Sequence, residues 1–489
     1  MGPTSRPGAA IALVALVVTL LLPVAANGAD RLYWANFGAP ERISFANTDG
    51  SGGIDLNTGG SGIKIPIGLA LDPSSGRAYW SNESAEGKIS FTNLDGSPGA
   101  GILQTGAANI KGPSGVAIDP VQRRIYWGNI GDSTISWANL DSPFGGGELN
   151  PGPASINGPY ELEVDTISRR LYWTNASGPA ISWAYLDGSG GADVPITGPV
   201  TMDSPFGLAI DPTEGKIYWA NSTLNGRISY ANLDGGGGAD LNTAGATVSE
   251  PVGVAVDPER NRVYWANRSG GLSFADTNGG GGANIKFAPG FASGTPNSPN
   301  LLASPRPLGA PSVSGPAKPG GKLSCGTGDW AADIVSASFY ATPTSFAYVW
   351  SRSGKAVAGT NGATVITQGV AEYRCTVTAT NPSGSSAQTS KIAAVFKIGK
   401  VKLDKRKGTA KLSVTLPGSG TLKVTGKGAK AAKKKVGGAK TVTVRIKAKG
   451  KAKRSLASKG KAKLKLKVSF STSDGGVASQ PKKIVLRKK

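Results

Sequence analysis

Apolar and polar positions alternate along many short stretches of the chain, and this alternation predicts β-strands. Residues 207–211 alternate small and large side chains, as expected for a strand packed closely on both faces, and Asp211-Pro212 then predicts a turn. Further along, apolar residues interleave with lysines, which is typical of a strand with one apolar and one polar face. The apolar set is Leu464, Leu466, Val468 and Phe470, and the interleaved lysines are Lys463, Lys465 and Lys467.

The strand pattern is organised into repeats. A Tyr-Trp pair occurs six times at intervals of 46 or 47 residues, beginning at Tyr33, Tyr79, Tyr126, Tyr172, Tyr218 and Tyr264. Each pair is followed by a small residue and an asparagine, and a basic residue stands two positions before it. Each repeat resolves into four short strands, including a hairpin signal such as Asp234-Gly235. Four strands per repeat predict the blades of a β-propeller.

These repeats resemble the YWTD (class B) repeats of the low-density-lipoprotein-receptor family. The resemblance covers residues 30–305 and implies a six-bladed β-propeller. The final Asp of the family's motif is Asn in all six copies here, for example Asn36 and Asn82. The resemblance therefore implies the fold, but not a ring of carboxylates or a shared ligand.

Closure of the ring requires a strand from far along the chain. The first repeat lacks the inner strand that precedes Tyr-Trp elsewhere, as in Gly253-Val-Ala-Val-Asp257. The repeat spacing places the missing Asp position on Ser304. We therefore expect residues 299–305 to supply the inner strand of the first blade, which removes an exposed sheet edge.

The next segment, residues 306–396, contains both cysteines of the chain. Trp350 lies midway between Cys325 and Cys375, and Tyr373 precedes the second cysteine by two residues. This arrangement resembles a bacterial-type immunoglobulin-like β-sandwich. The resemblance implies a Cys325–Cys375 disulfide in an exported chain; two buried free thiols are the alternative.

Charge is concentrated in residues 397–489, which contain 30 Lys and Arg but only 2 Asp, a net charge of +28. The alternation there predicts a small lysine-rich β-sandwich, with a loop at Lys433, Lys434 and Lys435. Together with Lys463, Lys465 and Lys467, these lysines are candidates for binding a polyanion, either an anionic cell-envelope polymer or a phospholipid surface. A well-solvated surface is the alternative. Nucleic acid is disfavoured as a partner, because no aromatic platform accompanies the lysines.

Residues 1–29 have the features of a secretory signal peptide. A short basic region containing Arg6 precedes an apolar run over 9–22, and small residues allow cleavage after Ala26 or Ala29. A retained N-terminal anchor is the alternative. Either reading predicts an extracellular or cell-surface location.

Composition limits the catalytic chemistry available. The chain has no histidine, which excludes a histidine-dependent lyase and a Ser-His-Asp hydrolase. Glu161 and Glu163 replace the small residues of other inner strands and share one strand face. They could hold Ca²⁺ in a metal-dependent hydrolase or lyase. The alternative is a salt bridge to Arg169 or Arg170.

The sequence therefore favours an all-β binding or scaffold protein that is not an enzyme and needs no cofactor. Its ligand would be a protein or glycan that the sequence does not identify. Tyr160 and Phe206 are the candidate anchors on a ligand-binding face, and packing between blades is their alternative role. A metal-dependent enzyme and a purely structural envelope protein remain the other two interpretations.

Overall fold

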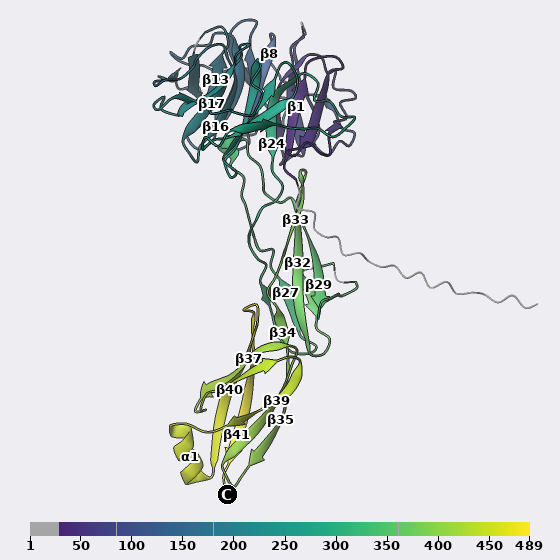
Figure 1. Cartoon of the computed structure of the whole chain (residues 1–489), viewed down its shortest axis with the longest axis vertical. Helices are drawn as coiled ribbons and strands as arrows, with labels where there is room; N and C mark the ends of the chain where they lie inside the picture. Colours follow the sequence, from purple (N-terminus) through teal and green to yellow (C-terminus); the bar gives the residue numbers. More distant parts are fainter. Residues whose placement is uncertain (1–28, 85, 179, 360) are drawn as a thin grey trace, which may run out of the picture.

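A computed structural model describes residues 29–84, 86–178, 180–359 and 361–489. It consists of strands, with a 3-10 helix η1 (Val335–Ala337) and one α-helix α1 (Lys451–Lys459) in the described ranges. Figure 1 shows the propeller at one end, a slender middle sandwich, and a basic sandwich at the other end. The predicted signal peptide lies outside the described residues, apart from Ala29. Within the described ranges, no helix combines the length and apolar character needed to cross a membrane.

Six four-stranded antiparallel sheets form the propeller and confirm the predicted blade architecture. From the inner to the outer edge, the first three sheets are β24 (Pro296–Leu302), β1 (Arg31–Asn36), β2 (Arg42–Asn47), β3 (Ile54–Asp55); β4 (Pro66–Asp72), β5 (Arg77–Asn82), β6 (Lys88–Asn93), β7 (Gly101–Ile102); and β8 (Pro113–Asp119), β9 (Arg124–Asn129), β10 (Thr134–Asn139), β11 (Gly146–Glu148). The other three are β12 (Pro159–Asp165), β13 (Arg170–Asn175), β14 (Ala180–Tyr185), β15 (Gly191–Asp193); β16 (Pro205–Asp211), β17 (Lys216–Asn221), β18 (Arg227–Asn232), β19 (Ala239–Asp240); and β20 (Pro251–Asp257), β21 (Arg262–Asn267), β22 (Leu272–Asp276), β23 (Gly282–Asn284).

The repeated asparagine is a structural residue of the blade. The Asn82 side-chain amide donates to Ser90 Oγ at 2.8 Å, while its Oδ1 accepts from the Lys64 backbone N–H at 2.9 Å. Asn221 makes the equivalent two contacts. A carboxylate can accept but cannot donate. This double role explains why all six copies carry Asn where the YWTD motif has Asp.

The basic residue two positions before each Tyr-Trp pair stacks on an aromatic ring of the neighbouring strand. The guanidinium carbon of Arg170 lies 3.7 Å from the Trp183 ring centroid, and that of Arg77 lies 4.4 Å from the Phe91 centroid. In five repeats the planar guanidinium of an arginine covers the ring, and in the fifth repeat the Lys216 ammonium lies 5.3 Å from the Tyr230 ring centroid. These contacts explain why each of the six repeats has an arginine or a lysine at this position.

The ring closes as predicted, but the closing strand begins and ends three residues earlier than expected, and the position matched to Asp lies two residues earlier. Strand β24 spans Pro296–Leu302, not 299–305, and pairs with β1. Leu302, not Ser304, occupies the end position where other inner strands have Asp. The missing carboxylate comes from the N-terminal side: buried Asp30 accepts from Ser304 N at 2.8 Å and from Arg306 at 2.7 Å.

The middle sandwich contains the predicted disulfide, which joins Cys325 and Cys375. Trp350 is buried in the same cluster, and the Tyr373 hydroxyl accepts a 2.7 Å hydrogen bond from the Gln368 backbone N–H. The disulfide connects two sheets, because Cys325 lies in β27 (Lys322–Cys325) and Cys375 lies in β32 (Ala371–Asn381). The sheets are β25 (Pro307–Gly309) with β28 (Asp329–Trp330); β26 (Val313–Ser314), β27 (Lys322–Cys325) and β31 (Thr364–Ile366); and β30 (Lys355–Ala356), β29 (Ser345–Arg352), β32 (Ala371–Asn381) and β33 (Gly384–Thr389), with β34 (Ala393–Val395) also pairing with β32.

The basic sandwich has two antiparallel sheets with a shared apolar interior. One consists of β35 (Lys397–Asp404), β36 (Thr409–Leu416) and β39 (Lys440–Ile446); the other of β38 (Ala432–Gly437), β37 (Ser419–Lys427), β40 (Lys461–Thr472) and β41 (Val477–Arg487). The loop predicted at Lys433, Lys434 and Lys435 is wrong, because all three lie in the edge strand β38 and are exposed. Lysines on an edge strand fit this position, since their charge discourages pairing with another chain.

Candidate functional site

The six inner strands of the propeller surround a narrow axis. Most of them carry glycine at the third position, and a Cβ atom added to Gly207 would lie only 2.6 Å from Gly253 Cα. Neighbouring inner strands therefore approach so closely that a side chain there would require the backbone to move. Four of the six inner strands have glycine at the third position and alanine at the fifth, so they present no polar side chain at these two positions.

The two exceptions are β12 and β24, which lie opposite each other in the ring of six. β12 presents Tyr160, Glu161 and Glu163; β24 presents Asn297, Ser298 and Asn300 at the matching positions. The Asn297 amide donates to the Tyr160 hydroxyl at 3.0 Å, and Ser298 Oγ donates to a Glu161 carboxyl oxygen at 3.2 Å. Polar side chains of opposite blades are thus hydrogen-bonded across the axis. We call these six residues the axial seam.

The axial seam borders a small cavity of ≈ 20 Å³ that Glu161, Glu163, Ser298 and Asn300 help to line. This volume suffices for one or two water molecules, since a single water needs roughly 10–15 Å³ by this measure. It does not suffice for an organic substrate. The axis of the propeller is therefore filled mainly by its own side chains.

Burial controls the protonation of the two glutamates. It raises the pKa of Glu161 well above its usual value, and the nearby Glu163 charge raises it further. Burial also raises the pKa of Glu163 to about 8. Within the described ranges neither carboxyl forms an ion pair. The predicted salt bridge is wrong: Arg169 binds Asp119 at 2.7 Å, and Arg170 stacks on Trp183.

Both glutamates are thus expected to hold a proton near neutral pH. Their carboxyl oxygens, together with the hydroxyl of Ser298 and the amide of Asn300, are the ligand types that Ca²⁺ prefers. In the described part of the chain, however, no three His, Cys, Asp or Glu side chains gather as a metal site. Calcium at Glu161 and Glu163 stays a prediction.

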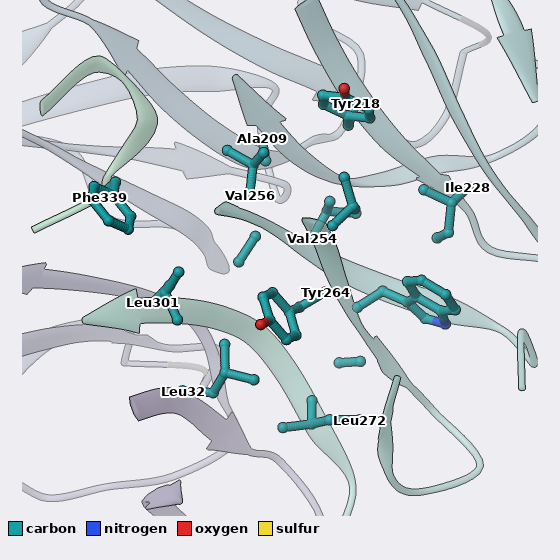
Figure 2. Close-up of a cluster of buried hydrophobic side chains, with 14 of the residues drawn as sticks. Leu32, Ala209, Tyr218, Ile228, Val254, Val256, Tyr264, Leu272, Leu301 and Phe339 are labelled. Carbon is teal, nitrogen blue, oxygen red and sulfur yellow. The ribbon is translucent and has the colours of Figure 1, made fainter. Parts of the chain in front are cut away.

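One mouth of the axis is covered by the middle sandwich. Ser338 Oγ donates to Glu163, and the Thr166 backbone N–H donates to Ser336 Oγ at 3.0 Å. Phe339 belongs to the same buried cluster as the inner-strand residues Val256 and Leu301, as Figure 2 shows. The segment around η1 therefore closes this end, and sequence reasoning gave no indication of it.

The opposite mouth carries the two predicted anchors, Tyr160 and Phe206. Their ring centroids are 4.2 Å apart, and the Arg268 guanidinium lies 5.7 Å from the centroids of both Phe206 and Phe37. Tyr160 is only 6 % exposed, whereas Phe206 is half-buried and remains partly accessible. Burial also raises the pKa of Tyr160 to about 12. The anchoring role of both residues stays a prediction, and the structure leaves more contact surface on Phe206 than on Tyr160.

The predicted lysines lie far from this axis, in the basic sandwich (Figure 1). Lys463, Lys465 and Lys467 are exposed on the outer face of β40, while Leu464 and Leu466 between them are buried. The alternation seen in the sequence is therefore the alternation of the sheet's two faces. Lys433 pairs with Lys423 of β37, so the edge lysines extend the same sheet.

Sequence reasoning missed Asn297, Ser298 and Asn300, because the closing strand was aligned two residues late. A signal for the correct alignment was present. Each inner strand begins with proline: Pro66, Pro113, Pro159, Pro205, Pro251 and Pro296. Aligning Pro296 with the other five places the three polar residues at the axis.

No protein-family profile matches the chain, and no curated protein is significantly similar to it in sequence. Among solved structures, it is similar to a chain of the nidogen/laminin complex, with 19% identity and a TM-score of 0.45, over 56% of this chain and 98% of that one. It is also similar to a gluconolactonase from Xanthomonas campestris, with 18% identity and a TM-score of 0.38, over 55% of this chain and 88% of that one. At these values neither likeness assigns a ligand or an activity, and the fold rests on this chain's own sheets.

Proposed function

We propose that this chain is an exported binding or scaffold protein. The propeller is its ligand-binding module for a protein or glycan, the middle sandwich is an immunoglobulin-like spacer, and the basic sandwich attaches the protein to an anionic cell envelope. The observation that carries this proposal is a lysine surface on the sheet β38-β37-β40-β41, none of whose lysines forms an ion pair in the part of the chain that the structure describes. It consists of Lys433, Lys434, Lys435, Lys463, Lys465 and Lys467.

This lysine surface has no acidic counterpart. The basic region holds 30 basic residues and only Asp404 and Asp474 as acids. Asp474 is already paired with Arg374 of the middle sandwich at 2.8 Å. Such an excess of one sign creates a strong local field that attracts polyanions and weakens as salt screens it.

The geometry of the propeller fits a binding function better than a catalytic one. Its cavity of ≈ 20 Å³ is too small for a substrate, and one mouth is covered by the segment around η1. A ligand would therefore sit on the opposite mouth, where Phe206, Phe37 and Arg268 combine aromatic surface with a cation. Aromatic residues and arginine are the types that most often dominate protein interfaces.

Salt-dependent cell association tests the attachment. The full chain should bind cells at low ionic strength and be released at high ionic strength. Replacing Lys463, Lys465 and Lys467 by Gln should weaken retention strongly, because each lysine at an anionic membrane surface contributes on the order of 1 kcal/mol. The matched control replaces Lys397, Lys402 and Lys411, which are exposed on the other sheet.

If both triple variants remain bound as firmly as the unaltered chain, the attachment proposal fails. The same holds if a chain ending at residue 396 stays cell-associated, because the anchor would then lie in the N-terminal part.

A further inference from the structure

The basic sandwich contains a hollow of ≈ 770 Å³ beside the lysine surface. Its walls are the end of β37, the segment from Lys449 to Ala452 that enters α1, and the beginning of β40 (Figure 1). Five lysines line it: Lys427, Lys449, Lys451, Lys463 and Lys465. The remaining lining residues are small, namely Gly426, Gly428, Ala429, Gly450, Ala452, Ser455 and Ala462. A volume of this size lies within the range of ligand pockets, roughly 300–1,000 Å³.

Backbone contacts hold the walls in place. The Lys449 N–H donates to the Gly428 carbonyl at 2.7 Å, and the Lys430 N–H donates to the Lys447 carbonyl at 2.9 Å. Gly428 has a φ of +81°, and a Cβ there would lie 2.8 Å from Ala452 Cβ. Glycine is therefore required where the strand end passes the beginning of α1, and the hollow is a built feature of the fold.

The charges in the hollow are uncompensated. Lys427 lies directly opposite Lys465 on the neighbouring strand, and Lys465 lies directly opposite Lys483. Like charges at directly opposed positions destabilise a sheet. None of the five lining lysines forms an ion pair in the part of the chain that the structure describes, and the first turn of α1 contains no acid. An anion bound in the hollow would relieve this repulsion.

Resting on the proposed attachment, we infer that this hollow binds the phosphate groups of a phosphodiester polymer. A lysine ammonium is a compact charge with three donors, suited to phosphate oxygens of varied orientation. No aromatic side chain lines the hollow, so it offers no platform for nucleobases.

The surface beyond the hollow supports a polymer rather than a flat bilayer. Lys463, Lys465 and Lys467 follow one another on the outer face of β40, at intervals of roughly 7 Å along the strand. A chain of short diols joined by phosphates presents charges at a comparable spacing. A flexible chain can enter the hollow and continue along this row, whereas a planar bilayer touches the rim of a hollow first.

The test measures binding of the full chain to a synthetic oligomer of propane-1,3-diol phosphodiester units, by titration at low ionic strength. The variant K449Q/K451Q alters two exposed lysines of the hollow that lie outside the β40 row. Affinity should fall roughly 30-fold, as expected for the loss of two lysine contacts. The matched control K402Q/K411Q removes two exposed charges from the other sheet and should change affinity less than about threefold. Unchanged melting temperatures show that both variants fold.

Equal losses in the two variants would overturn the hollow as a site while leaving general electrostatic attachment standing. Absence of any binding by the unaltered chain to the oligomer, to poly-glutamate and to phosphatidylglycerol vesicles would overturn both proposals. If vesicles or an oligonucleotide bind more tightly than the oligomer and depend on Lys449 and Lys451, the phosphodiester-polymer assignment is wrong.

Discussion

The propeller and the basic sandwich use charge in opposite ways. In the propeller, buried Asp72 at the end of one inner strand binds Arg123 of the next blade at 2.8 Å, and Asp119 binds Arg169 in the same manner at 2.7 Å. In the basic sandwich, lysines on neighbouring strands face each other without acids between them.

This difference separates two roles of charge in one all-β chain. Ion pairs between blades join elements that are distant in the sequence, so the propeller depends on the whole ring. The basic sandwich is stabilised by its apolar interior, and its surface charge remains available to a partner at the cost of mutual repulsion. Perturbations of one unit should therefore leave the other largely unchanged.

The largest expected effect is the loss of ring closure. Deleting Pro296–Leu302 removes the inner strand of the first blade and leaves β1 paired with β2 alone. The propeller should lose its cooperative unfolding transition, because an opened ring exposes a sheet edge and its core. Calorimetry of the full chain measures this, with the transition of the basic sandwich as the internal control. An unchanged propeller transition would contradict the role of β24.

The disulfide should have the next largest effect, confined to the middle sandwich. Cys325 and Cys375 are separated by 50 residues. Cys325→Ser should lower the free energy of unfolding of this unit by about 4 kcal/mol on the chain-entropy estimate. Hydrogen exchange of the β32 amides in increasing denaturant is the measurement, because the chain's ten tryptophans cannot be distinguished by fluorescence. Ser314→Ala, at an exposed position of the same sandwich, is the control. A loss spread equally over all three units would show that they do not unfold separately.

The axial seam should make the propeller alone sensitive to pH. Because burial raises the pKa of Glu163 from 4.5 to about 8, the folded state keeps a proton that the unfolded state releases between these values. Propeller stability should therefore fall as pH rises through this window, by about 1.4 kcal/mol per pH unit for each such carboxyl. The basic sandwich should lack this response, because its two acids, Asp404 and Asp474, are not buried.

Glu161→Gln together with Glu163→Gln should flatten this pH dependence and raise the propeller's melting temperature at pH 8. The control replaces Glu86 and Glu214, which are exposed. A pH profile of the propeller that is the same in all three proteins would argue against buried protonated carboxyls.

The smallest effect tests the hydrogen bond across the axis. Tyr160→Phe removes the hydroxyl that accepts from Asn297 and leaves that buried amide short of one partner. The propeller should lose about 1 kcal/mol of stability. Tyr185→Phe, at a partly exposed ring, should change it by less than about 0.5 kcal/mol. Equal small changes in both would mean that the contact contributes nothing measurable.

The six blades, the disulfide and the lysine alternation could be predicted because each has a residue pattern that can be recognised in the sequence without knowledge of the fold. A strand with Tyr-Trp at constant spacing needs no distant partner to be recognised, and Lys465 faces outward because Leu464 and Leu466 on either side of it face inward. The closing strand was harder to place. Its period of two is preserved by a shift of two residues, so β24 can be aligned late without exchanging its faces.

The fold class, the number of blades and the separation of charge between the two ends of the molecule follow from patterns in the amino-acid sequence. Three features became visible only in the folded chain. Tyr160 and Glu161 meet Asn297 and Ser298 across the axis, the segment around η1 covers one mouth, and five lysines surround a hollow. These features join residues far apart in the chain or on different elements, and their contacts depend on ring closure and sheet register. Local patterns set which face of a strand is buried, but not which distant side chain that face will meet.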